Sequence, residues 1–191
     1  MDRIRTQFWN LVEPEHLKVR AFCRKLMGDR DEGDDLYQDA LVSALSGFAS
    51  LKNVEAFRPW LYRIVVNTFK NHCRRVWWRR IIPLTEEIEE TSGGKSPAPA
   101  YAARRRLEDA FRALSPEDRA LVTLFELEGW KISEIAGITG KTEGNIKVRL
   151  SRARKKMRER LSRSLRESEQ YNLKTLWSED EICVVAKPGK K

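Results

Sequence analysis

The residues between Lys141 and Arg166 combine a dense positive charge with an apolar repeat of helical spacing. This stretch holds 11 Lys or Arg against two Glu, a net charge of +9 that equals the net charge of the whole 191-residue chain. The rest of the chain is therefore neutral. A basic helix on a neutral body is typical of a protein that binds a polyanion.

The basic segment has two kinds of face if it is helical. The apolar face carries Ile146, Leu150, Ala153, Met157 and Leu161. Side chains on the other faces can approach base edges in a major groove, which is wide enough to admit a helix. The candidates for this contact are Asn145, Lys147, Val148, Ser151 and Arg152. The cluster from Lys155 to Arg160 is better suited to phosphates, which position a protein without reading sequence.

The residues before the basic segment indicate a helix-turn-helix. Ala136, Gly140 and Ile146 stand at the offsets of a small residue at a close helix crossing, a turn glycine and an apolar residue. Ser115 and Pro116 mark the start of an earlier helix. A solvated basic face and a membrane-surface helix are the alternatives, and the second lacks the broad apolar face with Trp or Phe that it needs. DNA is the favoured partner.

Acidic residues gather in a second segment, where the stretch from Asp29 to Asp39 holds six acids against one Arg. DNA would repel this segment, so it is either solvated or faces a basic protein. The helix dipole favours acids at a helix start, which accounts for the residues up to Asp34. Asp35, Gln38 and Asp39 form a polar face further along the helix. These three residues are the candidates for a protein contact.

A third candidate surface is a polar stripe on the helix expected within Phe57–Arg80. Asn67, Lys70, Asn71 and Arg74 follow the spacing i, i+3, i+4, i+7 opposite the apolar positions. Asn side chains can donate and accept hydrogen bonds at a base edge, and neighbouring cations can hold a nucleic-acid backbone. An ordinary polar solvent face fits the spacing nearly as well.

The elements that position these surfaces are expected to be helices. The stretches Phe8–Asp29, Asp31–Leu51 and Phe57–Arg80 each show one apolar stripe, which includes Leu17 in the first stretch, and none shows strand alternation. Pro83–Ala103 has the proline, glycine and acidic composition of a linker. The sequence predicts an all-α chain of two small helical domains joined by a flexible linker. The predicted segments are a first domain over 1–82, a linker over 83–103, a helix-turn-helix domain over 104–166 and a tail over 167–191.

Catalytic and cofactor chemistry finds no support in the sequence. It contains no paired-carboxylate cluster with basic neighbours, no phosphate-cradling glycine loop and no metal-spaced His/Cys set. Cys23, Cys73 and Cys183 are odd in number and never form a CxxC pattern. No apolar run approaches the roughly 20 residues that span a bilayer, and the N-terminus lacks a signal-peptide core. We therefore expect a cytoplasmic protein that is not an enzyme, with no cofactor, no metal and no membrane insertion.

Three blocks of sequence, in this order, resemble one bacterial protein family. The blocks are GDRDEGDDLYQDALVSAL, FRPWLYRIVVNTFKNHCRR and LSPEDRALVTLFELEGWKISEIAGITGKTEGNIKVRLSRARKKM. They are similar to the extracytoplasmic function (ECF) group of bacterial sigma factors, and the resemblance covers roughly residues 5–165. Its fold would be the sigma region 2 helical bundle followed by the region 4 helix-turn-helix.

The resemblance implies a division of labour between the surfaces. Asp35, Gln38 and Asp39 would dock on a coiled coil of the large catalytic subunit of core RNA polymerase. The stripe that begins at Asn67 would face the minus-ten promoter element, where Asn67 helps to hold a base flipped from the stack. The helix-turn-helix would read the minus-thirty-five element of promoter DNA. An anti-sigma factor is implied as a further partner.

Some features remain open at the level of the sequence. The alternative function is a stand-alone helix-turn-helix transcriptional regulator, which predicts a palindromic site matched to a dimer. Trp77 and Trp78 stand among arginines and either stack on single-stranded DNA or cover the edge of the core. The tail over 167–191 lies outside the resemblance and is compatible with disorder, with covering an apolar patch or with regulation.

Overall fold

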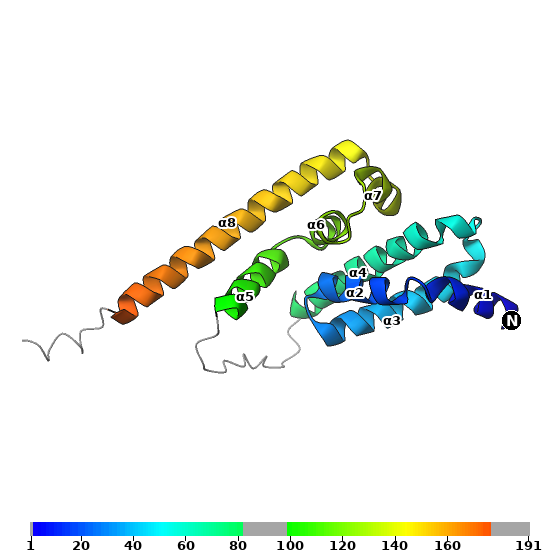
Figure 1. Ribbon diagram of the computed structural model, residues 1–191, viewed down its shortest axis with the longest axis horizontal. Coiled ribbons are helices and arrows are strands. Elements are labelled where there is room, and N and C mark those ends of the chain that lie inside the picture. Colours follow the sequence, from blue (N-terminus) through cyan, green and yellow to red (C-terminus); the bar gives the residue numbers. More distant parts are fainter. Residues whose placement is uncertain (1, 82–98, 177–191) are drawn as a thin grey trace, which may run out of the picture.

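The computed structural model describes residues 2–81 and 99–176 of the chain (Figure 1). We refer to these ranges as the N-terminal half and the C-terminal half. Within them every regular element is a helix and none is a strand. This confirms the predicted all-α fold class.

The N-terminal half begins with two helices where the apolar pattern predicted one. Its helices are α1 (Asp2–Val12), α2 (His16–Met27), α3 (Arg30–Gly47) and α4 (Phe57–Ile81), with short 3₁₀ turns η1 (Phe48–Ser50) and η2 (Val54–Ala56) before α4. Pro14 separates α1 from α2, because proline lacks an N–H and its ring clashes with the preceding turn. Leu17 was predicted for the apolar stripe but is 75% exposed, and Val19 is buried instead. The prediction for Leu17 was wrong because the break resets the helical phase.

The C-terminal half contains the predicted helix-turn-helix. Its helices are α5 (Pro99–Arg112), α6 (Pro116–Val122), the π-helical turn η3 (Thr123–Leu127), α7 (Ile132–Thr139) and α8 (Glu143–Leu176). The hydroxyl oxygen of Ser115 accepts the N–H of Asp118 at 3.1 Å, and Pro116 follows in the first turn, so the predicted helix start is confirmed. Helix α5 begins at Pro99, inside the range that the sequence assigned to the linker.

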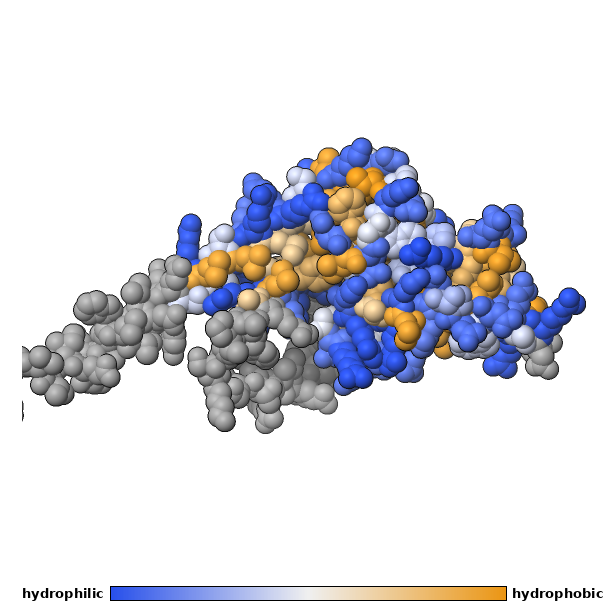
Figure 2. Space-filling model, viewed as in Figure 1, coloured by the Kyte–Doolittle hydropathy of each residue, from blue (hydrophilic) through white to orange (hydrophobic). Residues whose placement is uncertain are grey.

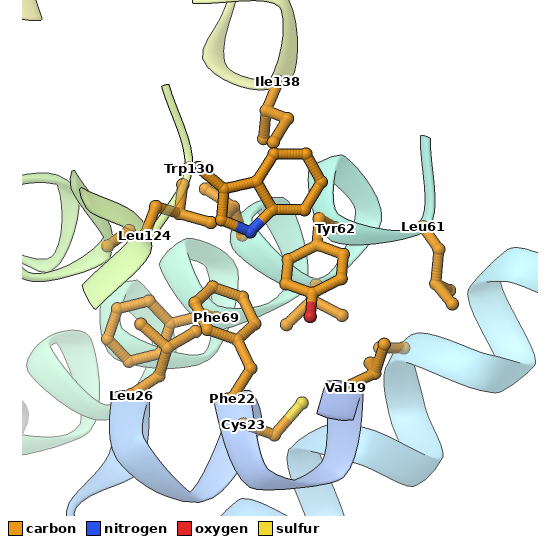
Figure 3. Packing of buried hydrophobic residues seen from close by; sticks show 14 of the residues in the cluster. Val19, Phe22, Cys23, Leu26, Leu61, Tyr62, Phe69, Leu124, Trp130 and Ile138 are labelled. Carbon is orange, nitrogen blue, oxygen red and sulfur yellow. The ribbon is translucent and has the colours of Figure 1, made fainter. Parts of the chain in front are cut away.

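The two halves pack against each other and share one hydrophobic core. Helix α4 contacts both α6 and α7. Figure 3 shows Leu26, Tyr62 and Phe69 of the N-terminal half facing Leu124 and Trp130 of the C-terminal half. Because all five side chains are buried, the contact between the halves is a true part of the core. The surfaces of both halves are therefore held in a defined relative position.

Candidate nucleic-acid interface

The turn between α7 and α8 has the geometry that its sequence predicts. Gly140 adopts the left-handed conformation with φ of 70°, which favours glycine, and its N–H donates to the carbonyl oxygen of Ala136 at 2.9 Å. The Thr142 hydroxyl accepts the N–H of Asn145 at 3.3 Å and caps α8. The glycine turn and the Thr142 cap set the angle between α7 and α8.

Helix α8 separates an apolar face from a polar one along its first turns. Ile146, Leu150 and Ala153 are buried as predicted, and Met157 and Leu161 are partly buried further along. The exposed set on the other faces comprises Asn145, Lys147, Val148, Ser151, Arg152 and Lys155. The structure thus brings all the predicted DNA-contacting candidates of this helix to solvent.

Arg149 is a positioning residue that the sequence reasoning missed. It forms ion pairs with Glu117 at 2.6 Å and with Asp118 at 2.8 Å, both on the first turn of α6. Lys141, in the turn before α8, also pairs with Glu117 at 2.8 Å. Burial on its own would raise the pKa of Glu117, but the hydrogen bond from Lys141 and the charge of Arg149 hold this pKa below its ordinary value. These contacts fasten the start of α8 to α6.

The acidic segment contains one carboxylate, that of Asp34, which forms ion pairs within the fold, and acids beyond it that have no partner among the described residues. Arg20 and Arg24 donate hydrogen bonds from α2 to both carboxylate oxygens of Asp34, at 2.6–2.8 Å. The hydrogen bonds from these two arginines hold the pKa of Asp34 well below its usual range. The account of Asp34 as part of a solvated helix start was therefore wrong, because this carboxylate fastens α3 to α2.

The predicted protein-contact face of α3 is exposed. The side chains of Asp35, Gln38 and Asp39 face solvent, and none has a side-chain hydrogen bond or ion pair within 2–81 and 99–176. The Asp29 side chain accepts the N–H groups of Asp31 and Glu32 and caps α3, at 2.8 and 3.0 Å. The unpaired face follows Asp34 directly, so the acids beyond it are available to a partner.

The polar stripe on α4 also faces solvent. Asn67, Asn71 and Arg74 are exposed and Lys70 is partly buried. A guanidinium nitrogen of Arg74 donates to the Asn71 side-chain oxygen at 3.3 Å, which leaves the amide group of Asn71 free to donate. Trp60, on the same helix, is partly buried against the core and packs on Phe48 and Phe57 at ring-centroid distances of 6.3 and 5.8 Å.

Both halves of the chain are similar to proteins of known family. Residues 11–79 match the model of sigma-70 region 2, and residues 104–157 match sigma-70 region 4. The ECF RNA polymerase sigma factor SigM of Mycobacterium tuberculosis is 30% identical over 153 residues, which cover 80% of this chain and 76% of SigM. The chain belongs to the ECF sigma factor family. It directs core RNA polymerase to promoters, as the resemblance of the three sequence blocks implied.

Further relatives of this sigma factor agree in sequence and in fold. RNA polymerase sigma factor SigV of Bacillus subtilis is 31% identical over 135 residues, 71% of this chain and 79% of SigV. The sigma factor RpoE from Bartonella quintana, solved in complex with the anti-sigma factor NepR, has the same fold with a TM-score of 0.58 and 24% identity, over 85% of this chain and 98% of that one. CnrH in complex with the cytosolic domain of CnrY gives a TM-score of 0.57 at 21% identity, over 83% and 89% of the two chains.

An apolar groove of about 1050 Å³ runs between the halves of the sigma factor. It lies between α5, α8 and the end of α2, and Met27, Leu107, Phe111 and Leu161 line its floor. Figure 2 shows apolar surface gathered along α5 and the adjoining part of α8. Leu107 and Leu127, which both line the groove, are 51% and 52% exposed.

Several predicted features lie outside the described residues. They are the side chains of Trp77 and Trp78, the linker up to residue 98 and the tail beyond residue 176. Among the residues that are described, no helix is long and apolar enough to cross a membrane. The same residues contain no group of His, Cys, Asp and Glu that could hold a metal ion.

Proposed function

We propose that each of the three exposed surfaces of this sigma factor has one partner. The face of Asp35, Gln38 and Asp39 docks on core RNA polymerase, while the polar faces of α4 and α8 meet promoter DNA. The observation that carries this assignment is the separation of charge: unpaired acids stand on α3, and cations stand on the other two helices. A polyanion repels the first surface and attracts the others.

The polar stripe on α4 that begins at Asn67 binds the minus-ten element in this proposal. Asn67 is exposed and its amide can both donate to and accept from a base edge. Capture of an extruded base offsets the few kcal/mol that unpairing and unstacking it costs. Arg74, one helical turn beyond Asn71, is placed to hold a phosphate of the same strand. Binding then drives melting, and the chain needs no chemistry of its own because core polymerase synthesises the RNA.

The exposed face of α8 binds the minus-thirty-five element in this proposal. Lys147, Ser151 and Arg152 lie within the first turns of the helix, the part of a recognition helix that contacts base edges. The ion pairs of Arg149 support this reading because they fix the helix on its neighbour. The protein works beside polymerase in the cytoplasm.

An anti-sigma factor is the third partner in this proposal, and the groove between the halves is its docking site. The groove offers apolar side chains to a hydrophobic face and carries Arg112 and Arg158 at its edge for an acidic one. The two structural neighbours that are complexed with an anti-sigma factor or a cytosolic regulator domain support the kind of partner. An occupant would contact both halves at once.

Co-elution with bacterial core RNA polymerase tests the proposal. The wild type should co-elute, and the double variant Asp35→Lys with Gln38→Ala should not. Asp109→Lys is the matched control, because it reverses the charge of an exposed acid on α5, a helix of the C-terminal half, and it should co-elute. Absence of wild-type binding together with tight, palindrome-dependent DNA binding would instead support a stand-alone regulator.

A further inference from the structure

The apolar groove continues along α8 as an exposed stripe. Met157 and Leu161 line the groove, and Leu165 lies one helical turn further along α8 and is 47% exposed. Leu107 of α5 faces the same space and is also about half exposed. Figure 2 shows apolar surface on both helices at this place. A contiguous apolar surface of this kind on a soluble protein marks an interaction site.

Exposed arginines accompany this stripe toward the end of α8. Arg158, Arg163 and Arg166 are exposed, and none of them has an ion pair within residues 2–81 and 99–176. Arg112 of α5 is a further exposed cation of the groove without an ion pair in these ranges. An occupant that enters from the end of α8 therefore meets cations first and then the apolar floor.

The C-terminal segment of this same chain carries the complementary groups in the complementary order. Residues 177–191 follow α8 and lie outside the match to sigma-70 region 4, which ends at residue 157. The segment contains three consecutive acids, Glu179, Asp180 and Glu181, and then an apolar run from Ile182 to Ala186. Acids followed by apolar residues match the surface that the chain meets when it turns back from the end of α8.

The length of the segment fits the distance that it has to cover. Leu161 precedes the end of α8 at Leu176 by 15 residues, or about 22 Å at roughly 1.5 Å per helical residue. Residues 177–182 span up to about 21 Å when extended, and residues 177–185 span up to about 31 Å. A chain that turns back along α8 can therefore place its apolar run over Leu161 and its acids beside Arg163 and Arg166.

We propose that the segment Glu179–Ala186 turns back on α8 and occupies the apolar groove of the free sigma factor. Docking removes apolar surface of the segment and of the groove from water, and it gives the unpaired arginines acidic partners. Because α8 tethers the segment beside the groove, its effective concentration is high and weak contacts are sufficient. A partner that binds the same groove has to displace the segment, and this consequence rests on the proposed function.

Disulfide trapping with the native Cys183 tests this docking, because Cys183 lies within the apolar run. A Cys73→Ser background leaves Cys23, which is buried and whose thiol pKa burial raises to about 12, so it stays unreactive. Leu107→Cys should form an intramolecular disulfide with Cys183 under mild oxidation. Arg105→Cys is the matched control, because it is exposed on the same helix about 200° around the axis. The groove cysteine should react roughly tenfold faster than the control, since docking raises its effective concentration.

A second pair of variants on α8 repeats the comparison. Leu161→Cys should react faster than Glu159→Cys, which is exposed at nearly the same height on the other side of the helix. Replacement of two apolar residues of the segment, Ile182→Ser with Val184→Ser, should lower the rates of both groove cysteines to those of their controls. Lys190→Ser should leave all rates unchanged. Added salt should slow trapping in the groove, because it screens the pairing of acids with exposed arginines.

Two results would overturn the proposal. Equal rates at groove and control cysteines would show that the segment does not dock, which would leave the groove to a separate partner. Disulfide-linked dimers whose yield falls on dilution would assign the groove to the segment of a second copy. Circular dichroism checks the fold, and the Leu161 pair decides if Leu107→Cys loses helix content. Trapping needs neither polymerase nor DNA, so failure of this docking and failure of the proposed function are distinguishable.

Discussion

The guanidinium carbon of Arg58 lies 4.5 Å from the centroid of the Trp130 ring and 5.9 Å from that of Tyr62. Arg58 also pairs with Glu15 at 3.4 Å. One cation on α4 thus joins the aromatic residue of the opposite half to the chain segment between α1 and α2. An arginine suits this position because its planar group stacks on rings while its charge pairs with a carboxylate.

Replacement of Arg58 by alanine should lower the free energy of unfolding by about 0.5–2 kcal/mol, the range of a cation–π contact at exposed to desolvated sites. Urea denaturation followed by tryptophan fluorescence measures the change. Arg58→Lys keeps the charge but loses the planar stack, so we expect an intermediate loss. Arg5→Ala, on the exposed part of α1, provides the control. An unchanged urea midpoint in Arg58→Ala would mean that the stacked cation contributes nothing to the stability of the fold.

A methyl group at Gly33 should destabilise the N-terminal half. A Cβ at this position would lie 2.5 Å from the Cα of Arg24, so α2 and α3 would have to move apart. Overpacking of this kind costs about 1–3 kcal/mol. Gly137→Ala is the matched control, since a Cβ there meets nothing within 4 Å and alanine favours a helix by up to about 1 kcal/mol. Opposite shifts of the two denaturation midpoints are expected, and a stabilising Gly33→Ala would refute the close crossing.

Stability should fall in acid partly because of Asp34. Its folded pKa lies below the ordinary value of 3.8 because Arg20 and Arg24 donate hydrogen bonds to the carboxylate. A depressed folded pKa contributes stability that is present above the unfolded value and is lost as the pH falls from about 4 toward the folded pKa. Urea midpoints at pH 7 and pH 3 should differ less in Asp34→Asn than in the wild type. Asp39→Asn is the control, because it removes an acid that has no ion pair among the described residues. If it reduces the difference between the two urea midpoints as much as Asp34→Asn does, the effect comes from the net charge of the protein and not from the ion pairs of Asp34.

Arg149 and Arg152 should fail in different ways when replaced. Arg152→Ala should cost about 1–3 kcal/mol on the minus-thirty-five element and little on unrelated DNA, since a lost base contact resembles a mismatch. Arg149→Ala should weaken binding to both sequences and lower stability, because its ion pairs hold α8 on α6. Fluorescence anisotropy with specific and scrambled duplexes separates these effects. A sequence-specific defect in Arg149→Ala would move this residue from a positioning role to base reading.

Local chemistry explains what the sequence predicted well. The helix start at Ser115, the left-handed Gly140 and the buried stripe of α8 each depend on residues within a few positions of one another. Contacts between residues far apart in the sequence left no comparable pattern in the sequence itself. Arg149 meets Asp118 across 31 positions, and Arg63 meets Gly137 across 74. Their partners depend on how helices pack, so the contact of Arg63 with α7 and the fastening of α8 to α6 emerge only in three dimensions.

Asn67 provides the sharpest test of promoter melting. Asn67→Ala should leave formation of the closed complex with core polymerase intact and reduce formation of the open complex, because under the proposed function the amide contacts a base only after that base leaves the stack. Permanganate reactivity of unpaired thymines at the minus-ten element measures opening, and filter binding measures total complex. Thr68→Ala is the neighbouring control, since its hydroxyl donates to the Ile64 carbonyl within α4. Equal losses of closed and open complexes in Asn67→Ala would assign this residue to general DNA affinity instead of base capture.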